Sequence, residues 1–399
     1  MRRVMVTGLG ALGALGPDVP RLARALRAGQ SAITRTPEGF AMPYQAALPP
    51  AWIDEALAGA GLPSTLVRRA SRPVRASLAV AAQAWQDAGL HRREPDGRRV
   101  AVVVGGNNLN GAQSAAATGR FDRDPALVPP RLALQYQDTD HVAALSEAFR
   151  IRGEGVTVGG ASASGALALI HGARLVTWGV ADVCLVVAAL AEPSPAELRS
   201  FLNLGAMVPT AGDGPGGPFD RGHRGFVHGP AAAAMVLEAP GAGRPLAELA
   251  GHAAGLDANS GPDPSVEGET DVLVRALAAA GAAPDEVDLV GAHGTGSPLG
   301  DRTEAAALRR VFGARTPWVN AVKGLAGHGL TAAGLLGAVA VVVQLRDGFV
   351  HPNPWLRDPI DGAPRLAGPQ ALDDAPRCAV SSAFGFGGFN SAVLWRAPR

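Results

Sequence analysis

The sequence predicts a layered α/β fold made of two similar halves. Short apolar stretches such as 100–105 and 181–188 alternate with longer segments whose apolar residues recur at helical spacing. The short stretches have no polar face, which is typical of strands covered by helices on both sides of a sheet. The chain has 399 residues, more than one hydrophobic core usually serves. We therefore expect an internal duplication, with one half over residues 1–240 and the other over 241–399.

Strands and helices are expected in both halves at positions set by apolar spacing and by turn residues. In the first half we expect a strand over 4–13, a helix over 64–90, strands over 100–105, 155–158 and 181–188, and a helix over 163–178. Residues 106–150 are polar and irregular, which indicates a lid or an interface. In the second half we expect strands over 246–254, 287–292, 318–322, 379–382 and 391–396, and helices over 265–280, 302–312 and 330–346.

Composition excludes several classes of protein. The 36 Lys and Arg residues balance 35 Asp and Glu residues, so a nucleic-acid binder held by a general positive field is not expected. The chain opens directly on a strand-like segment and its apolar runs are interrupted, so we expect a soluble, cytoplasmic protein with no membrane span. Cys184 and Cys378 lie in apolar runs and are expected to be buried free thiols. His223 and His228 are poorly spaced for a metal, and no metal site is expected.

The first apolar segment contains a glycine pattern that is similar to a nucleotide-binding motif. Gly8, Gly10 and Gly13 have the GxGxxG spacing of a dinucleotide-binding turn. Such a turn is followed, about 20 residues later, by a second strand that ends in an acidic residue. Residues 25–35 (ALRAGQSAITR) supply neither the strand nor the acid. Nucleotide binding is therefore not expected here.

Residues 158–167 (VGGASASGAL) predict a strand, a tight turn and a helix. The hydroxyl of Ser162 would lie on this turn, beside the first unpaired N–H groups of the helix. Those groups favour a negative charge that develops during a reaction. Serine is also a preferred helix N-cap, so a purely capping role for Ser162 or Ser164 stays open at this point.

Three further stretches place reactive or permissive residues where strands end, the usual position of sites in α/β proteins. GAHGTGSPLGD presents His293, and NAVKGLAGH presents Lys323 and His328 before an apolar helix. The third stretch, SAFGFGGFN at 382–390, is a glycine-rich turn whose backbone can approach a ligand closely. A single His or Lys in such a loop is usually structural. Several such stretches in one chain favour a functional site instead.

The order and spacing of GASASG, AHGTGSPLGD, NAVKGLAGH and SAFGFGGFN resemble those of the β-ketoacyl-ACP synthases, or ketosynthases. These are the decarboxylating condensing enzymes of the thiolase fold and of polyketide synthases. The resemblance covers essentially the whole chain, including the opening VMVTGLGALGALG and GPFDRGHRGFV. It implies a thiolase-like fold with two similar halves in α-β-α-β-α layers.

The resemblance also implies roles for individual residues. His293 and His328 match the two active-site histidines of the family, and Lys323 matches its motif lysine. Glu304 matches the acidic residue near that lysine, with which we expect Lys323 to pair. Phe386 matches the position whose backbone N–H completes the oxyanion hole and whose ring gates the pocket.

Ser162 departs from the family, whose nucleophile at this position is a cysteine. A thiol is partly ionised near neutral pH, whereas a hydroxyl stays protonated unless a base removes its proton. Acyl loading should therefore be impaired, while decarboxylation of a malonyl thioester needs only donors on the carbonyl that becomes an enolate. Ketosynthase-like proteins with Ser in place of Cys resemble this chain and are associated with making acetyl-ACP from malonyl-ACP, chiefly in β-branching cassettes. The resemblance thus implies a malonyl-ACP decarboxylase in which His293 and His328, as neutral imidazoles, supply these donors. The backbone N–H groups of Ser162 and Phe386 are expected to help hold the thioester carbonyl.

Two alternatives remain at the level of sequence. Ser162 can act as a true nucleophile if a nearby histidine activates it, which would preserve condensation or acyl transfer. A catalytically silent partner of an active ketosynthase, like a chain-length factor, is the other alternative. In its favour, HGPAAAA at 228–234 replaces a glycine-rich acidic turn of the family.

The expected partner is an acyl carrier protein that carries the malonyl group. Its acidic surface would meet Arg68, Arg69 and Arg72, although such a cluster before an apolar helix is more commonly a solvated helix start. No metal, nicotinamide or flavin is implied, because the phosphopantetheine arm comes with the carrier. Members of this family are usually dimers, so a homodimer is expected.

Overall fold

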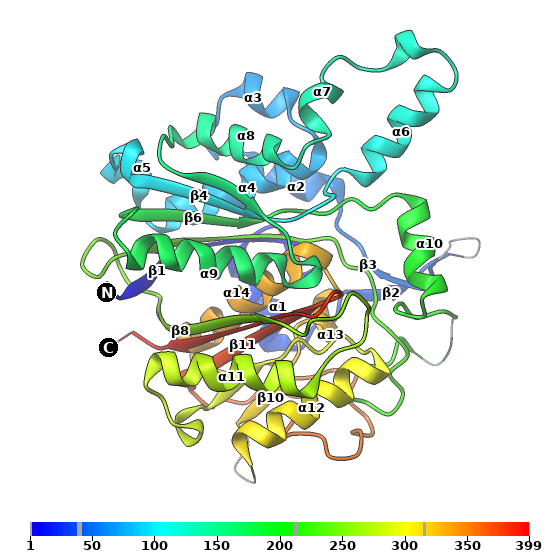
Figure 1. Ribbon diagram of the computed structural model, residues 1–399, viewed down its shortest axis with the longest axis vertical. Coiled ribbons are helices and arrows are strands. Elements are labelled where there is room, and N and C mark those ends of the chain that lie inside the picture. The colour runs from blue at the N-terminus through cyan, green and yellow to red at the C-terminus, as the bar shows by residue number, and fades with distance from the viewer. Residues whose placement is uncertain (1, 38–41, 211, 213, 314–316, 399) are drawn as a thin grey trace.

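The two halves of the chain share one strand order (Figure 1). The computed structural model describes residues 2–37, 42–210, 212, 214–313 and 317–398. In the first half the strands of the main sheet are β1 (Val4–Leu12), β4 (Val100–Gly105), β5 (Gly155–Val158), β6 (Val183–Ala188) and β7 (Ala232–Glu238). In the second half they are β8 (Ala247–Leu256), β9 (Leu289–Gly291), β10 (Trp318–Asn320), β11 (Cys378–Gly385) and β12 (Phe389–Arg396).

Across these described residues the sheet order is β10-β9-β11-β12-β8-β1-β7-β6-β4-β5. Each half therefore contributes its third, second, fourth, fifth and first strand in that sequence, and the two first strands meet at the centre. The third, second and fourth strands are parallel in both halves, and the fifth is antiparallel to its neighbours. Equal order and equal direction in both halves are what an internal duplication produces.

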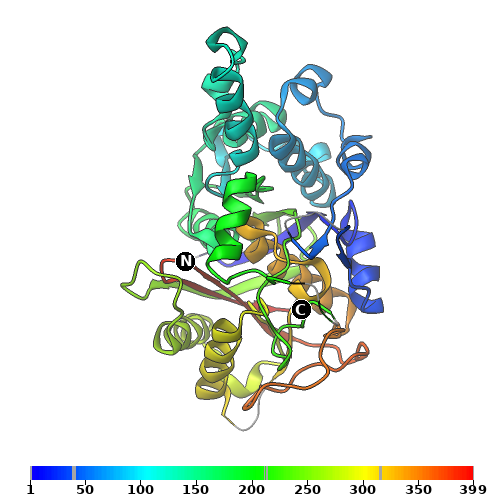
Figure 2. The same cartoon turned by 90° about the vertical axis from the view of Figure 1, so that its right-hand side faces the viewer.

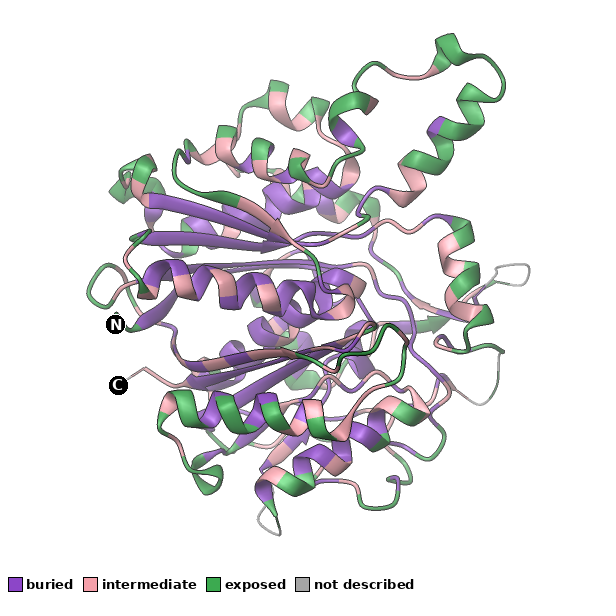
Figure 3. Ribbon diagram, in the orientation of Figure 1, coloured by how far each residue is buried: buried purple, intermediate pink, exposed green. Residues whose placement is uncertain are grey.

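The first-half and second-half strands lie as two β layers, and helices above, between and below them complete five layers, α-β-α-β-α (Figure 1). α4 (Arg72–Asp87) covers one outer face, and α11 (Val266–Ala280) and α12 (Pro298–Phe312) cover the other. α9 (Ser164–Thr177) and α14 (Ala333–Asp347) form the middle layer. Figure 3 shows that the middle helices and the strands are the most buried part of the fold. Most of the side chains of α9 and α14 are small or aliphatic, which suits helices buried between two sheet layers.

The remaining elements lie around these layers. They are α1 (Val19–Ala28), β2 (Ile33–Arg35), β3 (Tyr44–Ala46), α2 (Pro50–Leu57), α3 (Ser64–Arg69), α5 (Leu90–Arg93), α6 (Gly111–Phe121), α7 (Leu132–Gln135), α8 (Thr139–Phe149), α10 (Pro195–Asn203) and α13 (Lys323–Ala326). Short 3₁₀ turns lie at 97–99, 125–127, 161–163, 284–286 and 330–332.

Two expected elements differ from the structure. The single helix expected over 64–90 is broken between α3 and α4, because Ser71 caps the second helix and Pro73 cannot continue the first. The region 106–150, expected to be irregular, contains α6, α7 and α8. Figures 1 and 2 both show α6 and α7 projecting from the body of the molecule.

The glycines of the GxGxxG pattern pack two elements together. Gly8 and Gly10 lie inside β1, beneath α4. A Cβ at Gly8 would lie 2.1 Å from the carbonyl oxygen of Ala84, and one at Gly10 would lie 2.0 Å from that of Val80. Only glycine permits such a close approach, so the pattern has a packing cause in this chain.

The two cysteines and one long apolar segment are buried in the fold. Cys184 and Cys378 are buried free thiols, as expected. One segment of the described chain, Leu330–Asp347, is long and apolar enough to cross a membrane, but 78% of it is buried inside the fold. It contains α14 of the middle layer, and this position explains its apolar composition.

Candidate active site

The Ser162 turn lies between β5 and α9. Ala161 has φ of 48°, an unfavourable conformation for a residue with a Cβ, and begins the 3₁₀ turn that leads into α9. The N-cap of α9 is Ala163, which makes no side-chain cap bond. Ser164 Oγ instead accepts the Gly160 N–H at 2.9 Å and donates to the Ala161 carbonyl at 2.7 Å. The capping interpretation of Ser162 is therefore wrong, and its hydroxyl is available to the site.

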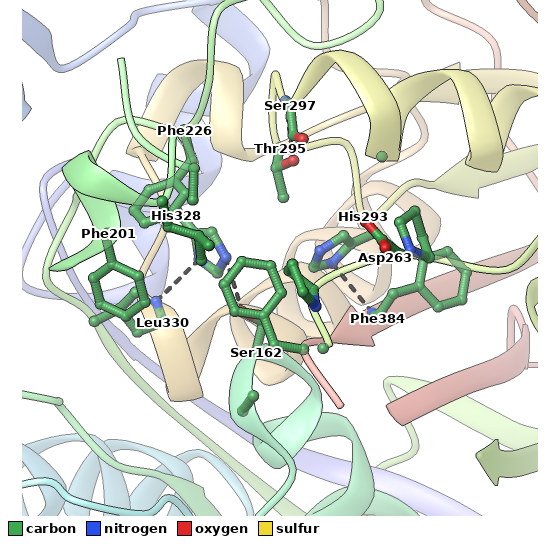
Figure 4. Close-up of a pocket in the computed structure, with 18 of the residues that line it drawn as sticks. Ser162, Phe201, Phe226, Asp263, His293, Thr295, Ser297, His328, Leu330 and Phe384 are labelled. Atoms are coloured by element: carbon green, nitrogen blue, oxygen red, sulfur yellow. Dashed lines mark hydrogen bonds between the residues drawn. The ribbon is translucent and has the colours of Figure 1, made fainter. Parts of the chain in front are cut away.

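The second half repeats this turn opposite the first. Leu330 has φ of 51° and begins the 3₁₀ turn that leads into α14. The two helices cross where Gly165 meets Gly334: a Cβ at Gly165 would lie 2.8 Å from Leu335 N, and one at Gly334 would lie 2.9 Å from Ala166 N. This crossing brings the N-terminal ends of α9 and α14 together. Ser162 and His328 consequently face each other (Figure 4).

His328 is held as a hydrogen-bond donor toward the pocket. Its Nδ1 accepts the backbone N–H of Leu330 at 3.0 Å, so the proton of the neutral ring is on Nε2. That Nε2 lies 3.0 Å from Ser162 Oγ and donates to it. The ring is 3% exposed and packs edge-on against Phe226, with 4.9 Å between centroids. Ser162 therefore receives a hydrogen bond from this histidine.

His293 is oriented in the same way. It follows β9, and its Nδ1 lies 3.3 Å from the Phe384 N–H and 3.4 Å from Lys323 Nζ, both of which are donors. The proton of this ring is therefore also on Nε2. The two imidazole centroids are 6.0 Å apart and nearly perpendicular. One edge of the His293 ring opens to the pocket, so two N–H donors converge on one small volume (Figure 4).

Both imidazoles are neutral near pH 7. Burial holds the pKa of His293 well below 6.5, and Lys323 and His328 lower it further. Burial likewise holds the pKa of His328 well below 6.5, with Lys323 and the buried His228 as further causes. A neutral imidazole N–H can stabilise a developing oxyanion by a hydrogen bond without transferring its proton to that oxygen.

Lys323 does not form the expected ion pair with Glu304 among the residues that the structure describes. Its ammonium instead donates to the carbonyl oxygen of His293. Glu304 accepts the N–H groups of His293 and Gly294 and the hydroxyl of Ser382, each at 2.8 Å. The carboxylate thus fixes the backbone that carries His293. Burial lowers the pKa of Lys323 to about 8, although Glu304 and Asp301 oppose that shift.

Lys323 is the only lysine in the chain, since the other 35 of the 36 basic residues are arginines. A compact ammonium on a flexible stem fits a 7% exposed position beside an imidazole, whereas a planar guanidinium requires more space and more acceptors. This solitary lysine is a sequence signal for the site that motif spacing alone does not use.

Asp301 supports the site, but the sequence motifs did not identify it. Its Oδ1 accepts the N–H groups of Thr295 and Gly296 at 3.2 and 3.1 Å. Its Oδ2 accepts the Phe219 N–H at 2.7 Å and lies 3.0 Å from His223 Nδ1. In the sequence, an acidic residue at the end of GSPLGD, directly after a glycine-rich loop, is the signal that could have identified Asp301.

The last residue of β11, where the glycine-rich turn begins, lies directly against the Ser162 turn. A Cβ at Gly385 would lie 2.6 Å from the Gly160 carbonyl and 3.2 Å from Ser162 N, so the two backbones touch. Phe386 follows at the pocket rim with 39% of its surface exposed, and the ring that packs against His293 is that of Phe384, at 5.6 Å. The oxyanion-hole role of Phe386 stays a prediction.

A cavity of about 470 Å³ is lined by Ser162, His293 and His328, together with Phe384 and Phe386. Phe201, Phe226 and Leu330 form one wall beside His328, and Thr295 and Ser297 lie toward another (Figure 4). Among the described residues, no group of three or more His, Cys, Asp or Glu residues has the arrangement of a metal site.

The arginine cluster divides at the break between α3 and α4. Arg68 and Arg69 are exposed in the last turn of α3. Arg72 begins α4, is less exposed, and forms an ion pair with Glu192. Arg72 is thus already engaged with a carboxylate of its own chain, which leaves Arg68 and Arg69 for an acidic partner.

The family model for the N-terminal domain of β-ketoacyl synthases matches residues 1–240, and that for the C-terminal domain matches residues 246–356. The chain belongs to the β-ketoacyl synthase family. Like its structural neighbours, it has the thiolase-like α/β fold.

Among curated relatives, it is 33% identical over 403 residues to polyketide biosynthesis malonyl-ACP decarboxylase PksF of Bacillus subtilis (strain 168), with 98% of this chain and 95% of the relative covered. It is 30% identical to 3-oxoacyl-[acyl-carrier-protein] synthase 2 of Coxiella burnetii (strain RSA 493 / Nine Mile phase I), with 98% of each covered.

Among solved structures, the ishigamide ketosynthase/chain length factor matches with a TM-score of 0.90 at 26% identity, over all of both chains. One chain from the structure of a type II PKS acyl-carrier protein in complex with its ketosynthase matches in fold, with a TM-score of 0.87 at 24% identity over all of both chains.

Proposed function

We propose that this ketosynthase-like protein decarboxylates malonyl-ACP to acetyl-ACP in polyketide biosynthesis of the β-branching type, without efficient condensation. The observation that carries the proposal is the pair of neutral imidazoles, His293 and His328, which both present Nε2–H to one pocket beside a serine that has no base. The 33% identity to a malonyl-ACP decarboxylase over nearly the whole chain supports it.

In the proposed reaction the thioester carbonyl of the malonyl group accepts hydrogen bonds from both imidazoles, and it replaces Ser162 Oγ as the acceptor of His328 Nε2–H. The bond between C2 and the carboxylate breaks, carbon dioxide leaves, and the electron pair forms the enolate whose oxygen the two N–H groups stabilise. A proton then adds to C2 and gives the acetyl thioester. Lys323 strengthens the His293 donor because its positive charge lies beside Nδ1 of that ring.

A serine nucleophile is the first alternative, and the 3.0 Å contact between Ser162 and His328 is the observation in its favour. A general base must accept the hydroxyl proton on Nε2. Here Nε2 is the protonated nitrogen, because Nδ1 accepts the Leu330 N–H. In a Ser-His-Asp triad a carboxylate would accept from Nδ1–H. The hydrogen bonds around His328 therefore disfavour acylation of Ser162.

A silent partner of an active ketosynthase is the second alternative, and likeness to a ketosynthase/chain length factor is the observation in its favour. Both imidazoles, Lys323 and the backbone-fixing Glu304 are nevertheless in a productive arrangement. A silent subunit has no need of oriented, neutral donors, so we favour the decarboxylase.

The experiment that tests the proposal follows malonyl-ACP by intact mass after incubation with the protein. Conversion to acetyl-ACP without added acyl-ACP supports decarboxylation. An unchanged malonyl-ACP mass contradicts it. Appearance of a β-ketoacyl product would favour the condensing alternative, and activity found only with a second ketosynthase chain would favour the partner alternative.

We further propose that the carrier docks at Arg68 and Arg69 and that the active form is a homodimer. The double variant Arg68→Glu/Arg69→Glu should raise KM for malonyl-ACP several-fold, more at low than at high salt, because these exposed charges attract an acidic carrier over a Debye length. Steady-state kinetics at two ionic strengths measures this. Arg92→Glu/Arg98→Glu, which reverses exposed arginines elsewhere, is the matched control. Equal KM values for both double variants would contradict docking of the carrier at Arg68 and Arg69.

A further inference from the structure

A buried histidine that the proposed reaction does not use contacts the carboxylate that supports the loop 293–297. The side chain of His223 is 5% exposed, and its Nδ1 lies 3.0 Å from Oδ2 of Asp301. Asp301 also accepts the backbone N–H groups of Thr295, Gly296 and Phe219. Because the carboxylate is the acceptor toward all of these groups, Nδ1 of His223 carries a proton and donates to it.

Two carboxylates of α12 hold the loop that begins with His293. Glu304 accepts the N–H groups of residues 293 and 294, and Asp301, one helical turn earlier, accepts those of residues 295 and 296. Positions three apart on a helix lie on the same face, so the two side chains form one row of acceptors beneath four successive N–H groups. A contact that fixes Asp301 therefore also fixes this loop.

The segment that begins at His223 reaches the second imidazole. Three residues later, the ring of Phe226 packs edge-on against His328, with 4.9 Å between centroids. The carbonyl oxygen of Val227 then accepts the backbone N–H of His328 at 2.7 Å. His223 thus joins the segment that supports His328 to the carboxylate that holds the His293 loop.

The turn before His223 needs such a contact. Phe219 is fully buried and has φ of 62°, an unfavourable conformation for a residue with a Cβ, and its N–H donates to the same Oδ2 of Asp301 at 2.7 Å. A backbone in this conformation persists only while the surrounding contacts hold it. The N–H of Gly225 adds one bond, at 2.8 Å, to the carbonyl oxygen of Gly296. Loss of the imidazole would leave that bond and the strained turn to join the two segments.

We propose that His223 is a positioning residue that sets the separation of the imidazoles of His293 and His328, whose centroids are 6.0 Å apart. Two N–H donors stabilise one enolate oxygen only if both reach it, and a displacement of about 1 Å can lower a rate by about 10²-fold. His223 acts through Asp301 and Phe226 rather than by contact with the substrate. This inference rests on the proposed function, in which the two imidazoles share one oxygen.

Substitutions that keep or remove the donor at Nδ1 test the inference. For His223→Leu, we expect kcat for malonyl-pantetheine to fall about tenfold and KM to change by less than about threefold, because the misplaced donors act mainly in the transition state. His223→Asn should restore kcat to within about threefold of the wild type, because its amide N–H lies near the position of Nδ1 and donates to Asp301. The matched control is His141→Leu, which removes a fully buried imidazole that bonds Ser77 between α4 and α8. This control should keep the wild-type kcat.

A wild-type kcat in His223→Leu, or a kcat in His223→Asn as low as that of His223→Leu, would overturn the positioning role. If His223→Leu does not fold, His223→Gln replaces it, because the glutamine amide lies near the position of Nε2 and leaves Oδ2 of Asp301 without this donor. His223→Asn should then exceed His223→Gln in kcat about fivefold or more, and equal values would overturn the inference.

NMR of the protein without substrate tests the same arrangement apart from the reaction. The ring ¹⁵N shifts of His293 and His328, assigned with His293→Ala and His328→Ala, should change in His223→Leu and stay near the wild-type values in His223→Asn and His141→Leu. Unchanged shifts in His223→Leu would overturn the inference. Changed shifts in a protein whose wild type does not decarboxylate would support the positioning role and contradict the proposed function alone.

Discussion

His293→Ala and His328→Ala should each lower the rate constant for malonyl-ACP decarboxylation by about 10²–10³-fold, the usual cost of removing one donor from an oxyanion site. Each imidazole supplies one of the two Nε2–H donors that converge in the pocket, and neither donor has a substitute in alanine. The effect should fall on kcat, because the donors bind the enolate oxygen more strongly than the carbonyl of the substrate. Single-turnover kinetics with malonyl-ACP, followed by intact mass, measures the rate constant.

The matched control for these variants is His171→Ala, which removes a partly exposed imidazole on α9 that contacts Glu154 rather than the pocket. This variant should decarboxylate at the wild-type rate. If both pocket variants lost less than about tenfold while their melting temperatures stayed near that of the wild type, the imidazoles would not be the enolate donors.

Lys323→Met should lower kcat by about 10–100-fold and should also remove the alkaline limb of the pH profile. The pKa of Lys323 is lowered to about 8 by burial, so the ammonium is charged below that pH and neutral above it. Charge beside Nδ1 of His293 makes its Nε2–H a stronger donor, and the wild-type rate should therefore fall as pH rises through about 8. The imidazoles are neutral throughout the range above pH 6.5, because their pKa values lie well below it, so no acidic limb is expected there.

Malonyl-pantetheine is the suitable substrate for this profile, because it eliminates the folding of the carrier as a cause. The single lysine also allows a direct measurement: protein labelled with ¹³Cε-lysine has one lysine side-chain signal, and its titration should have a midpoint near pH 8. An alkaline limb that persists in Lys323→Met would assign the titration to another group. A lysine midpoint near the ordinary 10.5 would contradict the environment described for Lys323.

Apolar patterning and motif spacing predict most of the fold and the identity of the histidines and the lysine. The expected strand over 100–105 coincides with β4, and the expected helix over 163–178 differs from α9 by one residue at each end. Side-chain packing between distant segments is less accessible to such reasoning. The glycines of β1 match a nucleotide-binding pattern in sequence, and only the position of α4 reveals that they permit a close backbone approach.

The chemistry of the site depends on hydrogen bonds that spacing does not encode. That His328 donates to Ser162 follows from a backbone N–H two residues later, positioned by an unusual conformation at Leu330. Glu304 was expected to pair with Lys323, but three donors from two other elements occupy its oxygens. Spacing indicates only that His223 is a poor metal ligand, and its contact with Asp301 emerges only when its loop packs against α12.

The central claim is that the protein decarboxylates without ever acylating Ser162, and intact mass measured on both proteins tests it most directly. Wild type and Ser162→Ala are each incubated with malonyl-ACP, and the masses of the carrier and of the ketosynthase-like chain are recorded together. We expect both to convert malonyl-ACP to acetyl-ACP at rates within a few-fold of each other, with no added mass on either chain, because His293 and His328 do the stabilising. An acyl adduct on the wild-type chain, together with loss of conversion in Ser162→Ala, would contradict the account.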